Sequence, residues 1–552
     1  MSPAENRFDP IAARAVRRGR AADGLLDAVR ATAGGTGPDH DAIARIAGTL
    51  GLPRASVRGP ATFFADLAAP HGRRHVRVCT AAACFAARSG AHLAEAERAL
   101  GVTAGHGNAQ VSLQQVRCLG FCYAGPACLD GDQPNVGADL AAQLAGLARP
   151  VAPPIPVSSA VDEPVVLAGI VAGRPAWRQW PRVARDGSRD EIVAQVAASG
   201  MCGRGGAGFP VARKWNAVSG ATGVVVIANG DEGDPGSYAD RLLMEEDPDR
   251  VLEGLALACF ATGARRGVVL VRSEYPLALA RMRAAVLRAR EAGHLGSAVH
   301  GGDVDLDIDI AEGVGSYVTG EETALIAALE GKRGTVRRRP PYPTSQGLWD
   351  APTVVNNVET LAAVPWIVER GGAAYARLGT EAERGTKLVC LSERFARPGC
   401  YEVQLGAPLR WIVEDLGGGL RDGGKLIALQ VGGPLGGFIG ADDLDITLTE
   451  ADLARRGAAL GHAGLVAFDE RVSGTALLRH AWGFAAEESC GACSPCRVGS
   501  RRGPELVRGE PTGEYRRLLQ VMQSASLCAF GRRVPPAVRS LARLYPELSG
   551  WM

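Results

Sequence analysis

Eight of the 13 cysteines fall into two groups whose spacing suits metal binding. In the first group, Cys79 and Cys84 (C-x4-C) are followed by Cys118 and Cys122 (C-x3-C). Each pair would lie on a loop beside a strand, and two thiolate pairs suit a 2Fe-2S cluster, in which each iron takes two cysteines. A four-cysteine zinc site also uses two pairs, although zinc ribbons prefer the shorter C-x2-C spacing. We therefore favour iron–sulfur and keep zinc as the alternative.

The second group is a run of three cysteines near the C-terminus, in the sequence ESCGACSPCRVG. Cys490, Cys493 and Cys496 (C-x2-C-x2-C) can hold three corners of a cubane 4Fe-4S cluster. Cys528 is the only other cysteine C-terminal to this run, and we expect it to supply the fourth thiolate. Three unligated thiols this close together would be prone to oxidation, which argues against a purely structural role.

A glycine-rich stretch, GRGGAGFP, could bring the backbone close to a ligand. It contains Gly203, Gly205, Gly206 and Phe209, and Lys214 follows. Glycines allow close approach to a phosphate or a flat ring, and a lysine could meet a phosphate. The motif alone is weak because a helix-like segment precedes it where a dinucleotide fingerprint would have a strand, and a structural glycine turn is the alternative.

Polar side chains gather after the predicted strand VVVIAN, where Asn229, Asp231, Glu232 and Asp234 follow one another closely. Ligands of wound α/β sheets bind at the carboxyl ends of strands. Carboxylates there would accept hydrogen bonds from sugar hydroxyls or a nicotinamide amide and would repel phosphate. Further polar residues with the same potential are Tyr317, Gly320, Glu321, Glu322, Asn356 and Asn357. Together these stretches predict a large pocket for a polar cofactor.

The apolar periodicity around these residues predicts a multidomain α/β chain of 552 residues. We expect, in order, a helical bundle at 1–70, a compact α/β domain at 71–147, a proline-rich linker at 148–185, a wound α/β domain at 186–380, a mostly β segment at 381–450 and a helical domain at 451–552.

Charge and hydropathy exclude several classes of protein. The chain has 61 basic and 59 acidic side chains, so no basic excess draws it to nucleic acid or to an anionic membrane. No window approaches the roughly 18 consecutive apolar residues of a membrane helix, and the N-terminal residues lack the features of a signal peptide. We expect a cytoplasmic protein without membrane insertion, in which the thiols are not a disulfide framework.

These motifs resemble, in order along the chain, those of the NADH-binding flavoprotein subunit of complex I and its soluble relatives. The resemblance covers about residues 190–544, through GRGGAGFP, NGDEGDPG, GVGSYVTGEETALIAALEGKRG, PPYP, NNVET and ESCGACSPCR. The first 150 residues resemble the thioredoxin-fold 2Fe-2S subunit of the same complexes. In layout the chain is therefore similar to a fusion of the two, as in the diaphorase subunits of soluble NAD-linked formate dehydrogenases and bidirectional hydrogenases.

The resemblance implies FMN, a 2Fe-2S cluster and a 4Fe-4S cluster as cofactors, with NAD(H) as substrate. It implies a thioredoxin-like 2Fe-2S domain, a Rossmann-like FMN/NAD domain, a ubiquitin-like β-grasp domain and a C-terminal helical bundle with the 4Fe-4S cluster. The positions that match the family's flavin contacts are Gly203, Gly205, Gly206, Lys214, Asn229, Asp231, Tyr317, Gly320, Glu321, Asn356 and Asn357. The dinucleotide would lie near Phe209, Glu232, Asp234 and Glu322. Hydride transfer needs no side-chain acid or base, so no catalytic residue is expected.

Several positions depart from the family's pattern. Asp234 replaces a customary Glu, Thr319 a Cys, Arg339 a Lys and Tyr342 a Phe, while Ala217 stands where an aromatic residue usually helps to stack the adenine. Glu322 would repel a 2′-phosphate and favour NAD. Arg339 near the ribose keeps NADP as the minority alternative.

The resemblance predicts a diaphorase subunit that passes electrons between iron–sulfur clusters and NAD through FMN. We expect the β subunit of a soluble formate dehydrogenase, whose separate molybdenum- or tungsten-containing subunit carries further clusters. A hydrogenase diaphorase and a complex I flavoprotein are the alternatives. Two other classes stay open: a non-catalytic redox relay that has lost NAD binding, whose flavin NADH would not bleach, and a colourless zinc-bound interaction protein.

Overall fold

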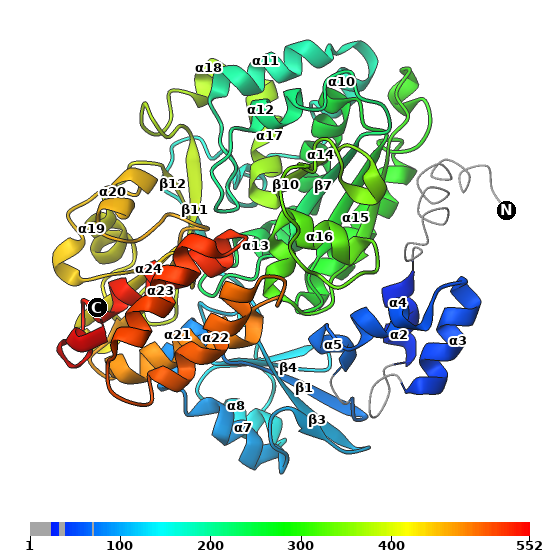
Figure 1. Cartoon of the computed structure of the whole chain (residues 1–552). Coiled ribbons are helices and arrows are strands. Elements are labelled where there is room, and N and C mark those ends of the chain that lie inside the picture. The colour runs from blue at the N-terminus through cyan, green and yellow to red at the C-terminus, as the bar shows by residue number, and fades with distance from the viewer. Residues whose placement is uncertain (1–23, 33–38, 69–70, 552) are drawn as a thin grey trace.

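The computed structural model describes residues 24–32, 39–68 and 71–551. Short N-terminal helices lie beside a first α/β domain, and a larger central α/β domain packs against a β domain and a C-terminal set of helices (Figure 1). Among the helices of these residues, none combines the length and the apolarity that a bilayer-spanning helix requires.

Four short helices form the part of the N-terminal segment that the structure describes. Leu25 and Val29, one turn apart, pack with Ile43 and Phe64 in a common core, which extends onto Val314 of the central domain. The predicted helical segment is thus seen as packed helices from residue 24 onward, and its part before that residue lies outside the described residues. The helices are α2 (Leu25–Thr32), α3 (His40–Leu50), α4 (Arg54–Ala61) and α5 (Ala65–Ala68).

The first α/β domain has a five-stranded sheet in the order β2-β3-β1-β4-β5. Its strands are β1 (Arg74–Cys79), β2 (His106–Gly107), β3 (Val111–Val116), β4 (Ala127–Asp130) and β5 (Gln133–Val136), and its helices are α6 (Ala82–Arg88), α7 (His92–Leu100) and α8 (Leu140–Leu144). Strands β1 and β3 are parallel, with Cys79 opposite Val116 at their carboxyl ends. Because β4 enters the sheet at that same edge, the chain order brings both cysteine pairs together there.

The central domain is built on a parallel sheet in the order β10-β7-β8-β9. Its strands are β7 (Val225–Gly230), β8 (Arg266–Val271), β9 (Asp307–Glu312) and β10 (Thr353–Asn357). Alternate residues of β7 face opposite ways: Ile227 packs with Leu325, whereas Val226 packs in the main core with Leu255 and Leu361. Both faces of the sheet are therefore covered, as the Val-rich strands predict.

Helices wrap this sheet on both sides. They are α11 (Arg189–Ser199), α12 (Val211–Asn216), α13 (Ala239–Glu246), α14 (Pro248–Thr262), α15 (Pro276–Glu291), α16 (Glu322–Leu329), α17 (Val358–Arg370) and α18 (Gly372–Tyr375). The helix α14 packs on α17, and α16 follows a short 3₁₀ turn at Tyr317–Gly320.

The β domain has strands in the order β14-β13-β15-β11-β12, with β6 (Val157–Ser159) added at the edge. Its strands are β11 (Thr386–Leu391), β12 (Gly399–Gln404), β13 (Leu426–Val431), β14 (Phe438–Ile439) and β15 (Gly464–Asp469), and its α-helices are α19 (Leu409–Trp411) and α20 (Glu450–Arg455). A first hairpin, a helical crossover and a last strand that lies parallel to the first form the expected β-grasp arrangement. The predicted boundary at 450 is wrong, because β15 is the central strand of this sheet.

The predicted linker, 148–185, is only partly a spacer. It contributes β6 (Val157–Ser159) to the β-domain sheet and two helices, α9 (Ala168–Ala172) and α10 (Trp180–Asp186). The buried carboxylate of Glu402 accepts hydrogen bonds from three successive backbone N–H groups, at Val165, Val166 and Leu167. Composition predicts an extended chain but not the remote carboxylate that fixes it.

The C-terminal helices are α21 (Gly474–Glu488), α22 (Ser494–Leu506), α23 (Gly513–Ala525) and α24 (Ala529–Ala542). They pack on one another and, through α24, on β14 of the β domain. The predicted helical domain is therefore confirmed once its start is moved past β15.

A buried ion pair between Lys387 of β11 and Glu359 of α17 joins the β domain to the central domain, and both side chains are 1% exposed. We predict that Lys387→Met lowers the free energy of unfolding by about 3–5 kcal/mol, because the buried Glu359 loses its cationic partner. Urea unfolding followed by circular dichroism measures this. Lys425→Met, at an exposed lysine, is the matched control, and equal losses in the two variants would contradict the prediction.

Candidate functional site

The glycine-rich loop, residues 203–209, joins α11 to α12. A Cβ atom at Gly205 would lie 2.9 Å from the Cβ of Asn357, so the site excludes a larger residue. Gly206 has a φ of +98°, a left-handed value that favours glycine, and it faces Gly461 of the β domain. The loop therefore stays close to the end of β10 and can offer its backbone to a flat ring or a phosphate.

The predicted amides lie at the carboxyl ends of β7 and β10, which are neighbouring parallel strands with Asn229 opposite Asn357. The Asn229 side chain donates to the carbonyl of Gly320 at 2.9 Å, which ties β7 to the turn before α16. The Trp215 indole N–H donates to the Asn356 side chain at 2.9 Å, which ties β10 to α12. Residues far apart in the sequence thus meet at one edge, as predicted.

Two of the predicted residues also hold helices in place. The Glu321 carboxylate caps α16 by accepting hydrogen bonds from the backbone N–H groups of Thr323 and Ala324. The Asn357 side chain caps α17 and donates to Asp240 at 2.6 Å. Their orientation is therefore set by the protein before any ligand binds.

Charged groups surround an exposed aromatic ring at the mouth of the site. Lys214 Nζ lies 3.0 Å from the carbonyl oxygen of Val355 and 3.4 Å from the Glu322 carboxylate. Arg339 Nη1 donates to the same carboxylate at 2.6 Å. The Phe209 ring is 42% exposed, with Lys214 Nζ 5.8 Å from its centroid. An exposed ring beside balanced charges suits a nicotinamide dinucleotide.

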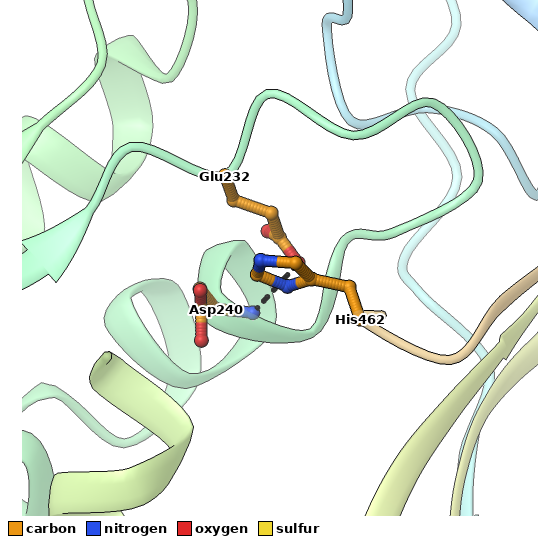
Figure 2. A group of neighbouring side chains, drawn as sticks. All are labelled: Glu232, Asp240 and His462. Carbon is orange, nitrogen blue, oxygen red and sulfur yellow. Dashed lines mark hydrogen bonds between the residues drawn. The ribbon is translucent and has the colours of Figure 1, made fainter. Parts of the chain in front are cut away.

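The Glu232 side chain is buried next to the start of α13. It accepts hydrogen bonds from Ser237 and from the backbone N–H groups of Asp240 and Arg241. Figure 2 shows Glu232 and Asp240 beside His462, whose possible metal-ligating atoms lie within 4.8 Å of one another. Protein donors already occupy these oxygens, so we assign the group to packing. The Glu232 side chain is thus held by the protein, and the position of the dinucleotide near this residue stays a prediction.

Asp231 lies buried behind the pocket. Its carboxylate accepts from Thr319 Oγ1 at 2.5 Å and lies 3.3 Å from Arg272 Nε, and burial raises the pKa of Asp231 to about 7. Arg272 and its ion-pair partner Glu274 were not predicted from the sequence. The signal that could have found them is their position directly after β8, at the same edge of the sheet as Asn229.

Tyr317 connects the pocket to the C-terminal helices. Its hydroxyl donates to Asp234 at 2.5 Å, and burial raises the pKa of Asp234 to about 6. Its ring packs edge-on against Phe484, with the centroids 5.0 Å apart, and also contacts Phe530. One face of the predicted pocket thus adjoins the helices that carry the second cysteine group.

The first cysteine group is buried as a unit. Cys79, Cys84, Cys118 and Cys122 are each at most 1% exposed, and the Sγ atoms of Cys118 and Cys122 lie 3.2 Å apart. Hydrogen bonds from the Cys118 and Cys84 thiols lower the pKa of Cys79. The backbone N–H of Gly236, from the central domain, donates to Cys122 Sγ at 3.3 Å. Four thiols that face one another away from water fit a 2Fe-2S cluster.

The second cysteine group lies where two helices begin. Cys493 precedes α22 and Cys528 precedes α24, so both helices direct their N-termini toward the group. With Cys490, Cys496 and Phe530, these residues line one hollow. The positive ends of the helix dipoles favour the negative charge of thiolates and cluster. Cys528 thus joins the triplet as predicted, and the four thiols fit a 4Fe-4S cluster.

The helix α21 ends where the three regions meet. Glu487 pairs with Arg117, the residue before Cys118, at 2.7 Å. The adjacent Glu488 carboxylate accepts from the backbone N–H of Tyr317 at 3.0 Å. Two residues later the chain reaches Cys490. One helix end therefore contacts both cysteine groups and the predicted cofactor pocket.

Family models match three parts of the chain. The Nuo51 FMN-binding domain matches residues 196–366, the thioredoxin-like 2Fe-2S ferredoxin matches 19–140, and the NADH-ubiquinone oxidoreductase-F iron-sulfur binding region matches 476–549. The matched ranges contain the pocket and both cysteine groups. They identify FMN, NADH, a 2Fe-2S cluster and a 4Fe-4S cluster as what this chain binds, and they set the zinc alternative aside.

Relatives and solved structures agree. The chain is 39% identical over 360 residues to the NADP-reducing hydrogenase subunit HndC of Solidesulfovibrio fructosivorans, which covers 63% of this chain and 73% of that protein. It is 42% identical over 327 residues to the NADH-quinone oxidoreductase F 2 subunit of Rhizobium meliloti, covering 59% and 78%. A crystal structure of NAD⁺-reducing NiFe-hydrogenase in the H₂-reduced state matches with a TM-score of 0.85 and 30% identity, over 97% of this chain and 94% of that one.

Removing one thiolate tests the assignment of the second group. We predict that Cys528→Ser lowers the iron content by about four per chain and leaves the 2Fe-2S signal intact in electron paramagnetic resonance (EPR) spectra, because the cubane loses a corner ligand. Cys202→Ser, at a thiol near the Gly200 carbonyl, is the control and should keep all iron. Full iron in the Cys528 variant would rule the residue out as a ligand.

Proposed function

Because this chain belongs to the family of NADH-binding flavoprotein subunits of complex I and its soluble relatives, we propose that it works as the diaphorase subunit of a soluble complex. It would exchange electrons between NAD(H) and the iron–sulfur clusters of a separate catalytic subunit. The observation that carries the proposal is the contact of α21 with both cluster loops and the flavin pocket, which joins the three sites in one packed unit.

FMN held by the residues of this pocket would supply the conversion between two-electron exchange with NADH and one-electron exchange with the clusters. The residues of the chain bind the flavin and the dinucleotide and orient them. Gly205 and Gly206 let the backbone approach the ring, and the bonds from Trp215 and to Gly320 hold Asn356 and Asn229 in position. Phe209 offers an exposed face on the dinucleotide side. These assignments, with the eight cysteine ligands, stand as proposals for each residue.

The proposed function has a direct test. Anaerobic addition of NADH to the purified protein should bleach the flavin absorbance within the mixing time of a stopped-flow instrument and then reduce both clusters. A flavin spectrum that NADH leaves unchanged would instead support the redox relay without NAD binding.

We propose NAD as the preferred dinucleotide, with weaker discrimination than Glu322 alone would give. Its carboxylate lies against both Arg339 and Lys214, so much of the negative charge that would repel a 2′-phosphate is balanced. The name of HndC describes that relative as NADP-reducing. The pair formed by Glu322 and Arg339 is therefore the proposed determinant of the choice.

Opposite substitutions in this pair should shift the preference in opposite directions. Glu322→Gln should raise the kcat/KM for NADPH relative to NADH several-fold, because the repulsion is lost. Arg339→Gln should lower the same ratio, because a cation that attracts the 2′-phosphate is lost. Assays with a small artificial electron acceptor measure both ratios. A shift in the same direction for both variants would contradict the proposed roles.

For the catalytic partner we propose a molybdenum- or tungsten-containing formate dehydrogenase subunit with its own clusters, in the cytoplasm. The resemblance in fused layout supports it. A hydrogenase partner is the second candidate, which the likeness to NAD⁺-reducing NiFe-hydrogenase over 97% of the chain favours. Assaying the co-purified complex for NAD reduction with formate and with hydrogen decides between the two partners. Activity with hydrogen alone would exclude the formate dehydrogenase.

The partner should present an acidic face to the 4Fe-4S region. Residues 490–552 contain ten arginines and four glutamates, a balance of +6, whereas the whole chain carries only +2. Arg497, Arg501 and Arg532 are exposed close to the cysteines in sequence. Long-range attraction speeds association and is screened by salt. Electron transfer to the partner should therefore slow with ionic strength more than transfer to a small neutral acceptor.

A further inference from the structure

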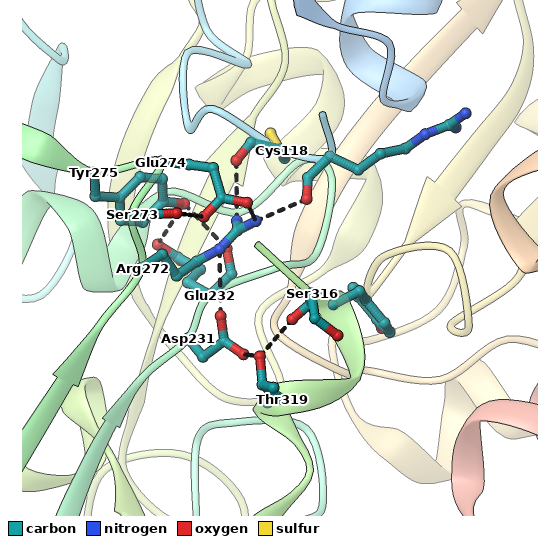
Figure 3. A network of polar contacts seen from close by, with 12 residues as sticks. Cys118, Asp231, Glu232, Arg272, Ser273, Glu274, Tyr275, Ser316 and Thr319 are labelled. Atoms are coloured by element: carbon teal, nitrogen blue, oxygen red, sulfur yellow. Dashed lines mark hydrogen bonds and ion pairs between the residues drawn. The ribbon is translucent and has the colours of Figure 1, made fainter. Parts of the chain in front are cut away.

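Arg272 is a buried arginine between the first cysteine group and the flavin pocket. It follows β8 directly, and its side chain is 1% exposed. Its guanidinium donates four hydrogen bonds, to the carbonyl oxygens of Arg117 (2.7 Å), Cys118 (2.9 Å) and Glu232 (2.7 Å) and to the Glu274 carboxylate (2.8 Å) (Figure 3). Its Nε also forms an ion pair with the Asp231 carboxylate, 3.3 Å away. Each of the three guanidinium nitrogens thus lies beside at least one protein acceptor.

One nitrogen of this group serves two sites. Arg272 Nη1 donates both to the Cys118 carbonyl, on the 2Fe-2S side, and to the Glu232 carbonyl, on the flavin side. Cys118 is a proposed ligand, and Glu232 follows Asp231 in the loop after β7. If either the Cys118 loop or the loop after β7 moved, one of the two hydrogen bonds that Arg272 Nη1 donates would break.

Other contacts hold the same cysteine loop against the central domain. Arg241 Nη1 donates to the carbonyl of Gly120 at 2.9 Å, and its guanidinium lies 3.9 Å from the centroid of the Phe121 ring. Gly120 has a φ of +72°, and a Cβ there would lie 2.7 Å from the Arg241 side chain. The cysteine loop thus meets two arginines. Arg272 reaches the flavin-side loop with its guanidinium, whereas Arg241 meets Glu232 of that loop through its backbone N–H.

The charge on Arg272 also bears on the cluster. Reduction adds one negative charge to a cluster that is already anionic, and a buried cation close by stabilises the added charge in a low dielectric. The negative charge of Glu274, which accepts from Nη2, opposes this effect. Removing the charge of one or the other member of the ion pair should therefore move the reduction potential in opposite directions.

We propose that Arg272 is a positioning residue that couples the 2Fe-2S cluster to the flavin site, by fixing both loops through one guanidinium and by favouring the reduced cluster through its charge. The inference rests on the proposed function for its meaning, since coupling matters only where electrons pass between the two sites. The test therefore measures the reduction of the 2Fe-2S cluster directly.

The test is an EPR redox titration of the holoprotein with dithionite and mediators. At the ambient potential where half of the wild-type 2Fe-2S cluster is reduced, the ratio of reduced to oxidised cluster should fall about tenfold or more in Arg272→Gln. Arg272→Lys keeps the charge and should lower the ratio less. Glu274→Gln should raise the ratio. The 4Fe-4S ratio should stay unchanged in all three variants and serves as the internal reference.

Arg250→Gln is the matched control, because Arg250 is also buried and contacts Asp247 and the Arg174 carbonyl. It should leave both ratios unchanged. If Arg272→Gln fails to retain its cluster, the Glu274 variant decides, since it leaves the arginine in place. An unchanged ratio in Glu274→Gln, or a shift of both variants in one direction, would overturn the proposal. Failure of the proposed function is separate: NADH would then leave the wild-type flavin unbleached whatever the cluster ratios are.

Discussion

The Arg272 guanidinium has no access to water, so its N–H groups must find acceptors within the protein. An unpaired buried charge would cost several kcal/mol, and three of the guanidinium's four hydrogen-bond acceptors are backbone carbonyls whose positions the chain cannot shift independently. Satisfying this one group therefore fixes the Cys118 loop, the loop after β7 and the end of β8 relative to one another. The separation of the two redox sites follows from that constraint.

The same constraint recurs wherever segments of different domains meet. Glu402 of β12 holds the segment before α9 through three backbone N–H groups, and Glu253 of α14 holds the segment before α10 in the same way. Lys387 and Glu359 join the β domain to the central domain. Each contact pairs a buried charge with groups from a remote part of the sequence. These contacts hold the domains together in one packed unit.

The sequence predicts the parts of this protein that depend on local spacing. The cysteine spacings, the glycines of the 203–209 loop and the Val-rich strands each reflect a short-range requirement of a cluster, a close approach or a buried sheet. The partners of buried charges are not local, and these were missed. Arg272 stands in no motif, and the hydrogen bonds from the start of α13 to the Glu232 carboxylate were not predicted. Nor were the ion pairs that join Glu322 to Arg339 and Lys214. The strand β15 was assigned to the helical domain because its parallel partner, β11, lies over 70 residues earlier.

The central claim is that one chain holds a flavin and two iron–sulfur clusters in a single packed unit. The most direct test is a quantitative analysis of iron, acid-labile sulfide and FMN in the protein purified without oxygen. The account predicts about six irons, about six sulfides and about one FMN per chain. Fewer than about three irons per chain would contradict both cluster sites together, and protein without flavin would contradict the pocket at the ends of β7 and β10.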